Sequence, residues 1–242
     1  MTTDISGRVE VSEDVHALSR RVADWFVDTV AAASGIVRIS LSGGSTPKEL
    51  YTLLASDEFR SRMAWDRLEL FWGDERFVSH DDPASNYRMT KEAMLSRVPI
   101  PPDRVHPVPV VGTPNDAALR YETLLKQIYG ADAFDPKRPL FDIMLLGLGA
   151  DGHTASLIPG QPVLEERKHW VAAVTSGRAE VRITLTYPAI ESSRTIAFLA
   201  AGPEKTSAVR AVRNGDQILP AARISPQGDV IWFLDRAAAG RA

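Results

Sequence analysis

The sequence predicts a three-layer α/β/α fold with a mostly parallel sheet and some antiparallel strands. Two observations carry this prediction. Short apolar runs of strand length alternate with longer segments of helical periodicity along nearly all of the 242 residues, a pattern typical of a parallel sheet covered by helices on both faces. Glycine loops also follow several of the apolar runs. No convincing linker interrupts the alternation, which continues across the proline-rich segment 99–102, so we expect one domain over residues 1–242.

The first predicted elements are a helix, a strand, a glycine loop and a second helix. Apolar residues recur at spacings of three and four over residues 12–33, which predicts a helix with one buried stripe. Ser12 is its expected N-cap. Residues 37–41 form a strand-like apolar run. Pro47 suits the first turn of a helix, which we expect to reach about residue 62.

A second strand and two helices are predicted next. Residues 68–72 form another apolar run, which ends in a charged loop at 73–77. A helix is expected over about 85–97, and a short extended piece at 105–110. The segment 115–129 is predicted to be a helix that is capped by its first residue, an asparagine, and ended by a glycine.

The second half of the chain predicts mostly strands. Residues 180–187 alternate between apolar and polar side chains, which is typical of a half-buried strand. Because three extended segments follow one another there, we expect some antiparallel pairing among them. The predicted elements are strands at 141–146, 170–174, 180–187, 195–200 and 230–234, a helix from about 203 to 213, and a frayed tail at 237–242.

Composition excludes several classes of protein. The net charge of −3 gives no basic field to attract nucleic acid. The absence of cysteine excludes disulfides, thiolate metal sites and a cysteine nucleophile. Residues 1–5 lack the basic and apolar pattern of a signal peptide, and no stretch approaches ~20 uninterrupted apolar residues. We therefore expect a cytoplasmic protein that binds neither nucleic acid nor membrane.

The segment 147–153 contains the strongest signal of a catalytic site. It follows the predicted strand at 141–146, contains three glycines, and places Asp151 beside His153. Ligands bind past the carboxyl ends of strands in open α/β sheets, so we interpret His153 as a base and Asp151 as an orienting acid. A capping or loop histidine is the alternative. The pattern Gly-x-Gly-x-x-Gly also matches here, but we disfavour a dinucleotide site because no acid ends a following strand ~20 residues later.

Two further loops follow predicted strands and carry polar groups. The loop 42–46 precedes a helix, so its N–H groups and hydroxyls could hold an anion at the helix N-terminus. A tight turn with a helix cap explains the same residues. In the loop 73–77, Asp74 could contact sugar hydroxyls and Arg76 could hold an anion, while an ordinary ion pair is the alternative.

Two more cations are weaker candidates. Arg182 lies on the polar face of the strand at 180–187, and Lys205 lies at a helix start, where a cation opposes the helix dipole. A bound anion would relieve that conflict. Either side chain could instead be a solvated charge. No pair of histidines has metal-ligand spacing.

Taken together, these segments resemble the 6-phosphogluconolactonase family. The resemblance implies a sugar-phosphate isomerase type of Rossmann-like α/β fold and a hydrolase of the oxidative pentose phosphate pathway. The substrate would be a phosphorylated sugar lactone, 6-phospho-D-glucono-1,5-lactone, opened without a metal or an organic cofactor. The matching segments occur in the family's order, at 41–47, 72–78, 85–87, 147–157 and 182–186.

The resemblance also implies roles for individual residues. His153 would take a proton from the water that attacks the lactone carbonyl, and Asp151 or a backbone group would orient its ring. Asp74 and Arg76 would line the lactone ring, and either Arg76 or a backbone N–H would stabilise the oxyanion. Asn86 would be a polar contact or a helix cap. The phosphate would be held by Gly43, Gly44, Ser45, Thr46, Arg182 and Lys205.

Two alternative functions remain. Glucosamine-6-phosphate deaminases resemble the chain in the same loops, but in that family a catalytic glutamate follows the histidine, and Ile158 occupies its position here. A catalytically silent sugar-phosphate sensor is the second alternative, although no DNA-binding extension is visible. The sequence leaves open the oligomeric state, the preference for a δ- or γ-lactone and any channelling partner.

Overall fold

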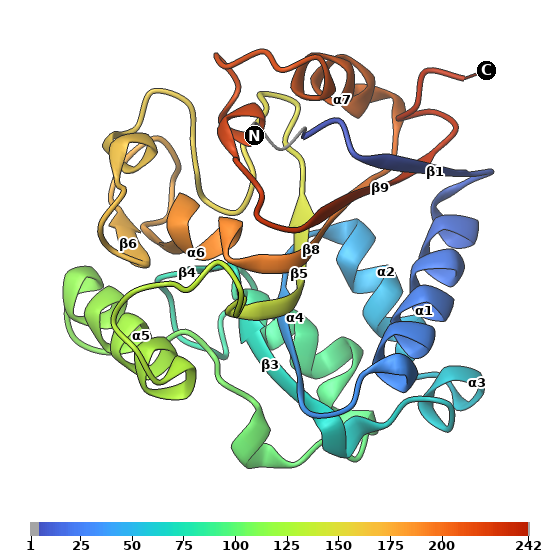
Figure 1. Cartoon of the computed structure of the whole chain (residues 1–242), viewed down its shortest axis with the longest axis horizontal. Coiled ribbons are helices and arrows are strands. Elements are labelled where there is room, and N and C mark those ends of the chain that lie inside the picture. Colours follow the sequence, from blue (N-terminus) through green and yellow to red (C-terminus); the bar gives the residue numbers. More distant parts are fainter. Residues whose placement is uncertain (1–4, 242) are drawn as a thin grey trace.

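The central element of the structure is a six-stranded sheet in which every neighbouring pair is parallel. The structure is a computed structural model that describes residues 5–241 (Figure 1). The strand order is β1-β9-β8-β5-β2-β3. The bounds of the strands are β1 Arg8–Ser12, β2 Val37–Leu41, β3 Leu68–Trp72, β5 Phe141–Gly147, β8 Ser193–Ala200 and β9 Asp229–Asp235.

Helices cover this sheet, as the sequence predicts. In Figure 1, α1 and α2 lie side by side, and α1 packs on β9 while α2 packs on β8. Most strand residues are buried, and the hydrophobic core is one continuous cluster. The bounds of the helices are α1 Val15–Ala32, α2 Ser45–Leu54, α3 Asp57–Arg60, α4 Asn86–Ala93, α5 Pro114–Tyr129, α6 Tyr187–Glu191 and α7 Thr206–Arg213.

A second, antiparallel sheet lies beside α5. Its strands are β4 (Asp74–Arg76), β7 (Arg182–Leu185) and β6 (Val171–Val174), in the order β4-β7-β6. Antiparallel pairing of 170–174 with 180–187 is therefore confirmed. The same expectation is wrong for 195–200, because β8 joins the parallel sheet. The predicted loop at 73–77 contains β4, which pairs with β7.

The order of the parallel strands creates a crevice between β2 and β5. The chain moves from β2 to β3 in one direction, and from β5 through β8 to β9 in the other. The loops that follow the two adjacent strands β2 and β5 therefore diverge. Such a switch point at the carboxyl ends of the strands is where open α/β sheets bind ligands. The loops 42–46 and 147–153 both begin there.

Some predicted boundaries are wrong at the ends of helices. The N-terminal strand β1 was not predicted, and because Ser12 ends that strand, the N-cap of α1 is Asp14, whose carboxylate accepts from the backbone N–H of Ala17 at 2.8 Å. The helix expected from Pro47 begins at Ser45 and breaks after Leu54.

Three other differences concern α5, β7 and the chain ends. Helix α5 is capped by Thr113 in a capping box, not by Asn115. The polar face of β7 is buried at Thr184, so both faces of this strand are covered. The expected tail is partly packed, because Ala238 is buried and donates its backbone N–H to Asp235. Residues 1–4 and 242, which belong to the predicted N-terminus and tail, lie outside the described residues.

No helix within residues 5–241 is long and apolar enough to span a bilayer.

Candidate active site

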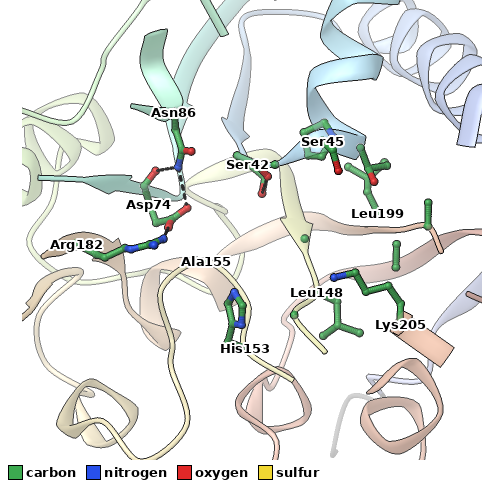
Figure 2. A pocket seen from close by; sticks show the side chains of 18 of the residues that line it. Ser42, Ser45, Asp74, Asn86, Leu148, His153, Ala155, Arg182, Leu199 and Lys205 are labelled. Atoms are coloured by element: carbon green, nitrogen blue, oxygen red, sulfur yellow. Dashed lines mark hydrogen bonds and ion pairs between the residues drawn. The ribbon is translucent and has the colours of Figure 1, made fainter. Parts of the chain in front are cut away.

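An open cavity of about 210 Å³ lies at the switch point between β2 and β5. Figure 2 shows the side chains that surround it, which come from both sheets. All of the predicted site residues except Asp151 line this cavity. The predicted set is therefore brought together, although its members are spread from residue 43 to residue 205. The lining residues from that set are Gly43, Gly44, Ser45, Thr46, Asp74, Arg76, Asn86, His153, Arg182 and Lys205.

The glycine loop after β2 presents the N-terminus of α2 to the cavity. Gly44 is the N-cap and has a φ of 108°, a conformation that residues with a side chain rarely adopt. No side chain within the described residues caps α2. Tyr51 fixes the start of the loop, because its hydroxyl bonds to both the backbone N–H and the carbonyl of Ser42. The N-terminal amides of α2 are thus held in place and left for an anion.

Asp74 is held on the other side of the cavity by three neighbours. Its side chain is buried, and the Oδ2 atom accepts a hydrogen bond from Ser156 Oγ at 2.6 Å. The Oδ1 atom lies 3.4 Å from Asn86 Nδ2, and Arg182 Nη1 lies 3.9 Å from Oδ2. The Asp74 carboxylate is therefore fixed in orientation by folding alone, and Figure 2 shows it between Asn86 and Arg182.

Glu75 explains how Asn86 reaches the cavity. The buried Glu75 carboxylate accepts from the backbone N–H groups of Asn86 and Tyr87 at 2.7 and 2.8 Å, and from Ser85 Oγ at 3.0 Å. It therefore binds the N-terminus of α4, where a negative charge is favoured. Burial raises the pKa of Glu75, although these hydrogen bonds oppose the shift. Asn86 in turn packs so closely on Gly43 that a side chain there would overlap it.

Two arginines face each other across the pairing of β4 with β7. Arg76 and Arg182 are register partners, and the Nε atom of each is buried without a hydrogen-bond partner among the described residues. Burial lowers the pKa of Arg182, and the neighbouring charge of Arg76 adds to this effect. Like charges directly opposite on paired strands are unfavourable, so an anion in the cavity would relieve this contact.

The side chains of His153 and Asp151 are in direct contact. The Nδ1 atom lies 2.5 Å from Asp151 Oδ1, and the ring lines the cavity while Asp151 does not. Gly149 lets the loop close tightly, because its backbone N–H donates to the His153 carbonyl at 2.8 Å. A Cβ atom at Gly149 would overlap both the His153 ring and the Asp151 carboxylate. The glycine is thus required by close approach.

Arg178 also contacts this pair and was not predicted from the sequence. Its Nη2 atom lies 2.6 Å from Asp151 Oδ2 and 3.1 Å from His153 Nδ1. Burial raises the pKa of Asp151, but the hydrogen bonds from His153 and Arg178 outweigh it and hold the pKa well below its usual range. No local pattern in the sequence links a loop arginine to residues about 25 positions earlier.

Lys205 enters the cavity from the side opposite Asp74 and Arg182 (Figure 2). Its nearest acidic neighbour among the described residues is Glu204, 4.0 Å away. Between the two sides lies Ala155, whose φ of 46° is positive. A strained residue with a side chain is often found at a functional site. Across residues 5–241, no three histidine or acidic side chains are grouped closely enough to hold a metal ion.

The comparisons with known proteins agree with this fold. Residues 13–232 match the family of glucosamine-6-phosphate isomerases/6-phosphogluconolactonase, and the chain belongs to that family. A 6-phosphogluconolactonase from Nostoc is 39% identical over 237 residues, which cover 95% of this chain and 96% of the relative.

Solved structures show the same fold. A 6-phosphogluconolactonase from Trypanosoma cruzi superimposes with a TM-score of 0.81 at 30% identity, covering 99% of this chain and 98% of that one. A monomeric glucosamine-6-phosphate deaminase has the same TM-score at 24% identity, covering 96% of this chain and 99% of that chain, so this likeness shows the fold alone.

Proposed function

We propose that the protein hydrolyses 6-phospho-D-glucono-1,5-lactone to 6-phospho-D-gluconate, a step of the oxidative pentose phosphate pathway. The observation that carries this proposal is the Asp151–His153 pair at the edge of a cavity that also holds an uncapped helix N-terminus and three cationic side chains. An anionic ester with a distant phosphate fits such a cavity. The names of relatives that match nearly the whole chain support the same activity.

In the proposed reaction, His153 acts as a general base. The Asp151 carboxylate accepts the hydrogen bond of His153 Nδ1, and the Nε2 atom is therefore free to take a proton from water. The water oxygen attacks the C1 carbonyl and forms a tetrahedral intermediate with a negative oxygen. The ring C1–O bond then breaks, and the imidazolium returns its proton to the departing ring oxygen. The product is a free carboxylic acid, which ionises, so no covalent intermediate on the protein is needed.

The remaining residues would bind the substrate. We infer that the 43–46 loop and Lys205 hold the phosphate. Both line the cavity, and the loop contains the N-terminus of α2, which has no side-chain cap. Asp74 and Asn86 would contact ring hydroxyls, and Arg76 and Arg182 would face the developing oxyanion or share the phosphate. An oxyanion is stabilised most by donors that folding has already placed. Phosphate binding far from the reacting carbonyl would position the ring.

A deaminase function is disfavoured by the residue at position 158. Ring opening and isomerisation of an amino sugar need a further acid or base, and Ile158 is buried outside the cavity lining. The acidic residue of the lining is Asp74, whose oxygens are engaged with Ser156 and Asn86. A sugar-phosphate sensor would need no base, and the oriented His153 gives no support to it.

Hydrolysis of freshly generated lactone against its spontaneous rate tests the proposal, with glucosamine 6-phosphate assayed in parallel for ammonia. We expect fast lactone opening and no ammonia. Ammonia release would identify a deaminase instead, while binding of the phosphosugar without either reaction would favour a sensor.

The variant His153→Ala tests the assigned base. We expect kcat to fall by roughly 100-fold or more, the usual scale for a general base, with an unchanged circular dichroism spectrum. His80→Ala is the matched control, because His80 bonds to the carbonyl of Val108 and lies outside the cavity lining. Turnover like that of the wild type in His153→Ala would exclude the proposed mechanism.

A further inference from the structure

The loop between β6 and β7 brings a cation to the candidate base from outside the cavity. Residues 175–181 form this loop, and Arg178 is the residue that contacts Asp151 and His153. The loop is anchored beside the site, because Ser176 Oγ donates to Gln161 Oε1 at 2.5 Å and Gly177 packs on the same glutamine side chain. The position of Arg178 is therefore part of the folded structure.

Arg178 and Asp151 compete for the same ring nitrogen. Asp151 Oδ1 lies 2.5 Å from His153 Nδ1, and Arg178 Nη2 lies 3.1 Å from it. A guanidinium only donates hydrogen bonds. If Nδ1 carries its proton, that proton goes to Asp151 and Nε2 is free to act as a base. A bond from Arg178 to Nδ1 would place the proton on Nε2 and block this role.

The shorter contacts decide between these two arrangements. Arg178 Nη2 is satisfied by Asp151 Oδ2 at 2.6 Å, and Asp151 Oδ1 then accepts from His153 Nδ1 at 2.5 Å. The carboxylate thus bridges the guanidinium and the imidazole with separate oxygens. In this arrangement the guanidinium compensates the charge of the carboxylate, and the carboxylate orients the ring.

Other charged groups do not replace Arg178 in this role. Within residues 5–241, the ring of His153 hydrogen-bonds to no side chains other than Asp151 and Arg178. The charged groups that line the same cavity from other elements are Asp74 and Arg76 on β4, Arg182 on β7, and Lys205 before α7. Glu180, in the same loop as Arg178, pairs with Arg182 at 3.3 Å.

We propose that Arg178 is a positioning residue for His153, which compensates the charge of Asp151 and keeps the Nδ1 proton of the ring directed at that carboxylate. The catalytic consequence of this inference rests on the proposed lactonase function. The effect of Arg178 on the tautomer of the His153 ring does not depend on that function.

Removing the charge of Arg178 tests the inference. In Arg178→Gln the uncompensated carboxylate favours the imidazolium, so we expect the acid limb of the kcat/KM profile to move to higher pH by about one unit. At a pH on the acid limb, kcat/KM should therefore be roughly tenfold lower than in the wild-type protein. At higher pH, kcat/KM should stay within about threefold of the wild-type value. Arg178→Lys keeps the positive charge, so its acid limb should lie close to that of the wild-type protein.

A control variant separates positioning from a general structural effect. Arg62→Gln removes an exposed arginine that pairs with Asp24 at 2.8 Å, away from the site, and should leave the profile unchanged. A uniform loss in Arg178→Gln at every pH, or no change in the limb, would overturn the inference.

A second measurement does not depend on the activity. The ¹⁵N chemical shifts of the His153 ring, identified by their loss in His153→Ala, report its tautomer and its titration midpoint. We expect the Nδ1–H tautomer in the wild-type protein and a higher midpoint in Arg178→Gln. If the wild-type protein fails to open the lactone, the proposed function fails alone. An unchanged midpoint in Arg178→Gln would overturn the inference whatever the activity.

Discussion

The two sides of the cavity differ in how completely the protein satisfies their polar groups. On one side, Asp74 is buried and bonded to Ser156 and Asn86. On the other side, the N-terminus of α2 has no side-chain cap, and Lys205 has no acidic partner closer than 4.0 Å within the described residues. Unsatisfied polar groups cost free energy unless water or a ligand binds them. The first side is completed by folding, whereas the second side is left for an anion.

This difference predicts different consequences for mutations on the two sides. A change on the Asp74 side should alter stability as well as activity. A change on the Lys205 side should alter substrate binding and leave stability almost unaffected. The two arginines Arg76 and Arg182 lie on the first side but keep unpartnered Nε atoms, so that side also retains some capacity for an anion.

The largest expected effect on stability comes from Asp74→Asn. This variant removes the negative charge that pairs with Arg182, and breaking a buried ion pair costs about 3 kcal/mol. For a chain of this size we expect Tm to fall by roughly 5–10 °C. Asp24→Asn is the matched control, because its ion pair with Arg62 is exposed, and it should change the free energy of unfolding by less than about 0.5 kcal/mol. Equal Tm values for the two variants would contradict the predicted difference between the buried Asp74 and the exposed Asp24.

A smaller effect, confined to binding, is expected for Lys205→Ala. Losing a charge-assisted hydrogen bond to the phosphate should raise KM by roughly 10- to 100-fold, with kcat and Tm nearly unchanged. Lys48→Ala is the control, since Lys48 lies in the first turns of α2 but outside the cavity lining. An unchanged KM in steady-state kinetics would exclude Lys205 from the phosphate site.

The smallest expected effect concerns the strained residue between the two sides. Ala155→Gly relieves the positive φ of 46°, which costs a residue with a side chain about 1 kcal/mol. Part of the gain is lost to the greater freedom of glycine in the unfolded chain, so we expect Tm to rise by about 1–2 °C in calorimetry. Ala33→Gly, at an ordinary φ of −73°, should lower Tm slightly instead. A decrease in both would show that Ala155 is not strained.

Most of the fold follows from local patterns in the sequence. The runs at 37–41, 68–72 and 141–146 are strands in the structure, because continuous apolar residues are buried on both faces of a covered sheet. Strand β1 was missed for the opposite reason. Its side chains are largely half-exposed at the sheet edge, so the segment becomes a strand through its pairing with β9 rather than through its own hydrophobicity.

The strongest local signals of the site are in residues that follow strands, whereas Asn86 was predicted from the family resemblance. His153 and the 42–46 loop come together because the carboxyl ends of β5 and β2 are adjacent. The opposition of Arg76 and Arg182 depends on the register of β4 with β7, which the sequence does not determine. Ser156 and Arg178 reach their carboxylate partners through loop conformations, and no spacing rule connects them with Asp74 or Asp151.

The pairing of β1 with β9 also determines how the protein responds to force. These strands are parallel, and their five register pairs run from Arg8 with Ile231 to Ser12 with Asp235. The chain enters β1 at one end of this pair and leaves β9 at the other, so tension between the termini pulls the two strands in opposite directions along their length. The hydrogen bonds between them are then loaded together instead of opening one after another. Unfolding by tension between the two ends of the chain therefore requires several of these hydrogen bonds to break at once.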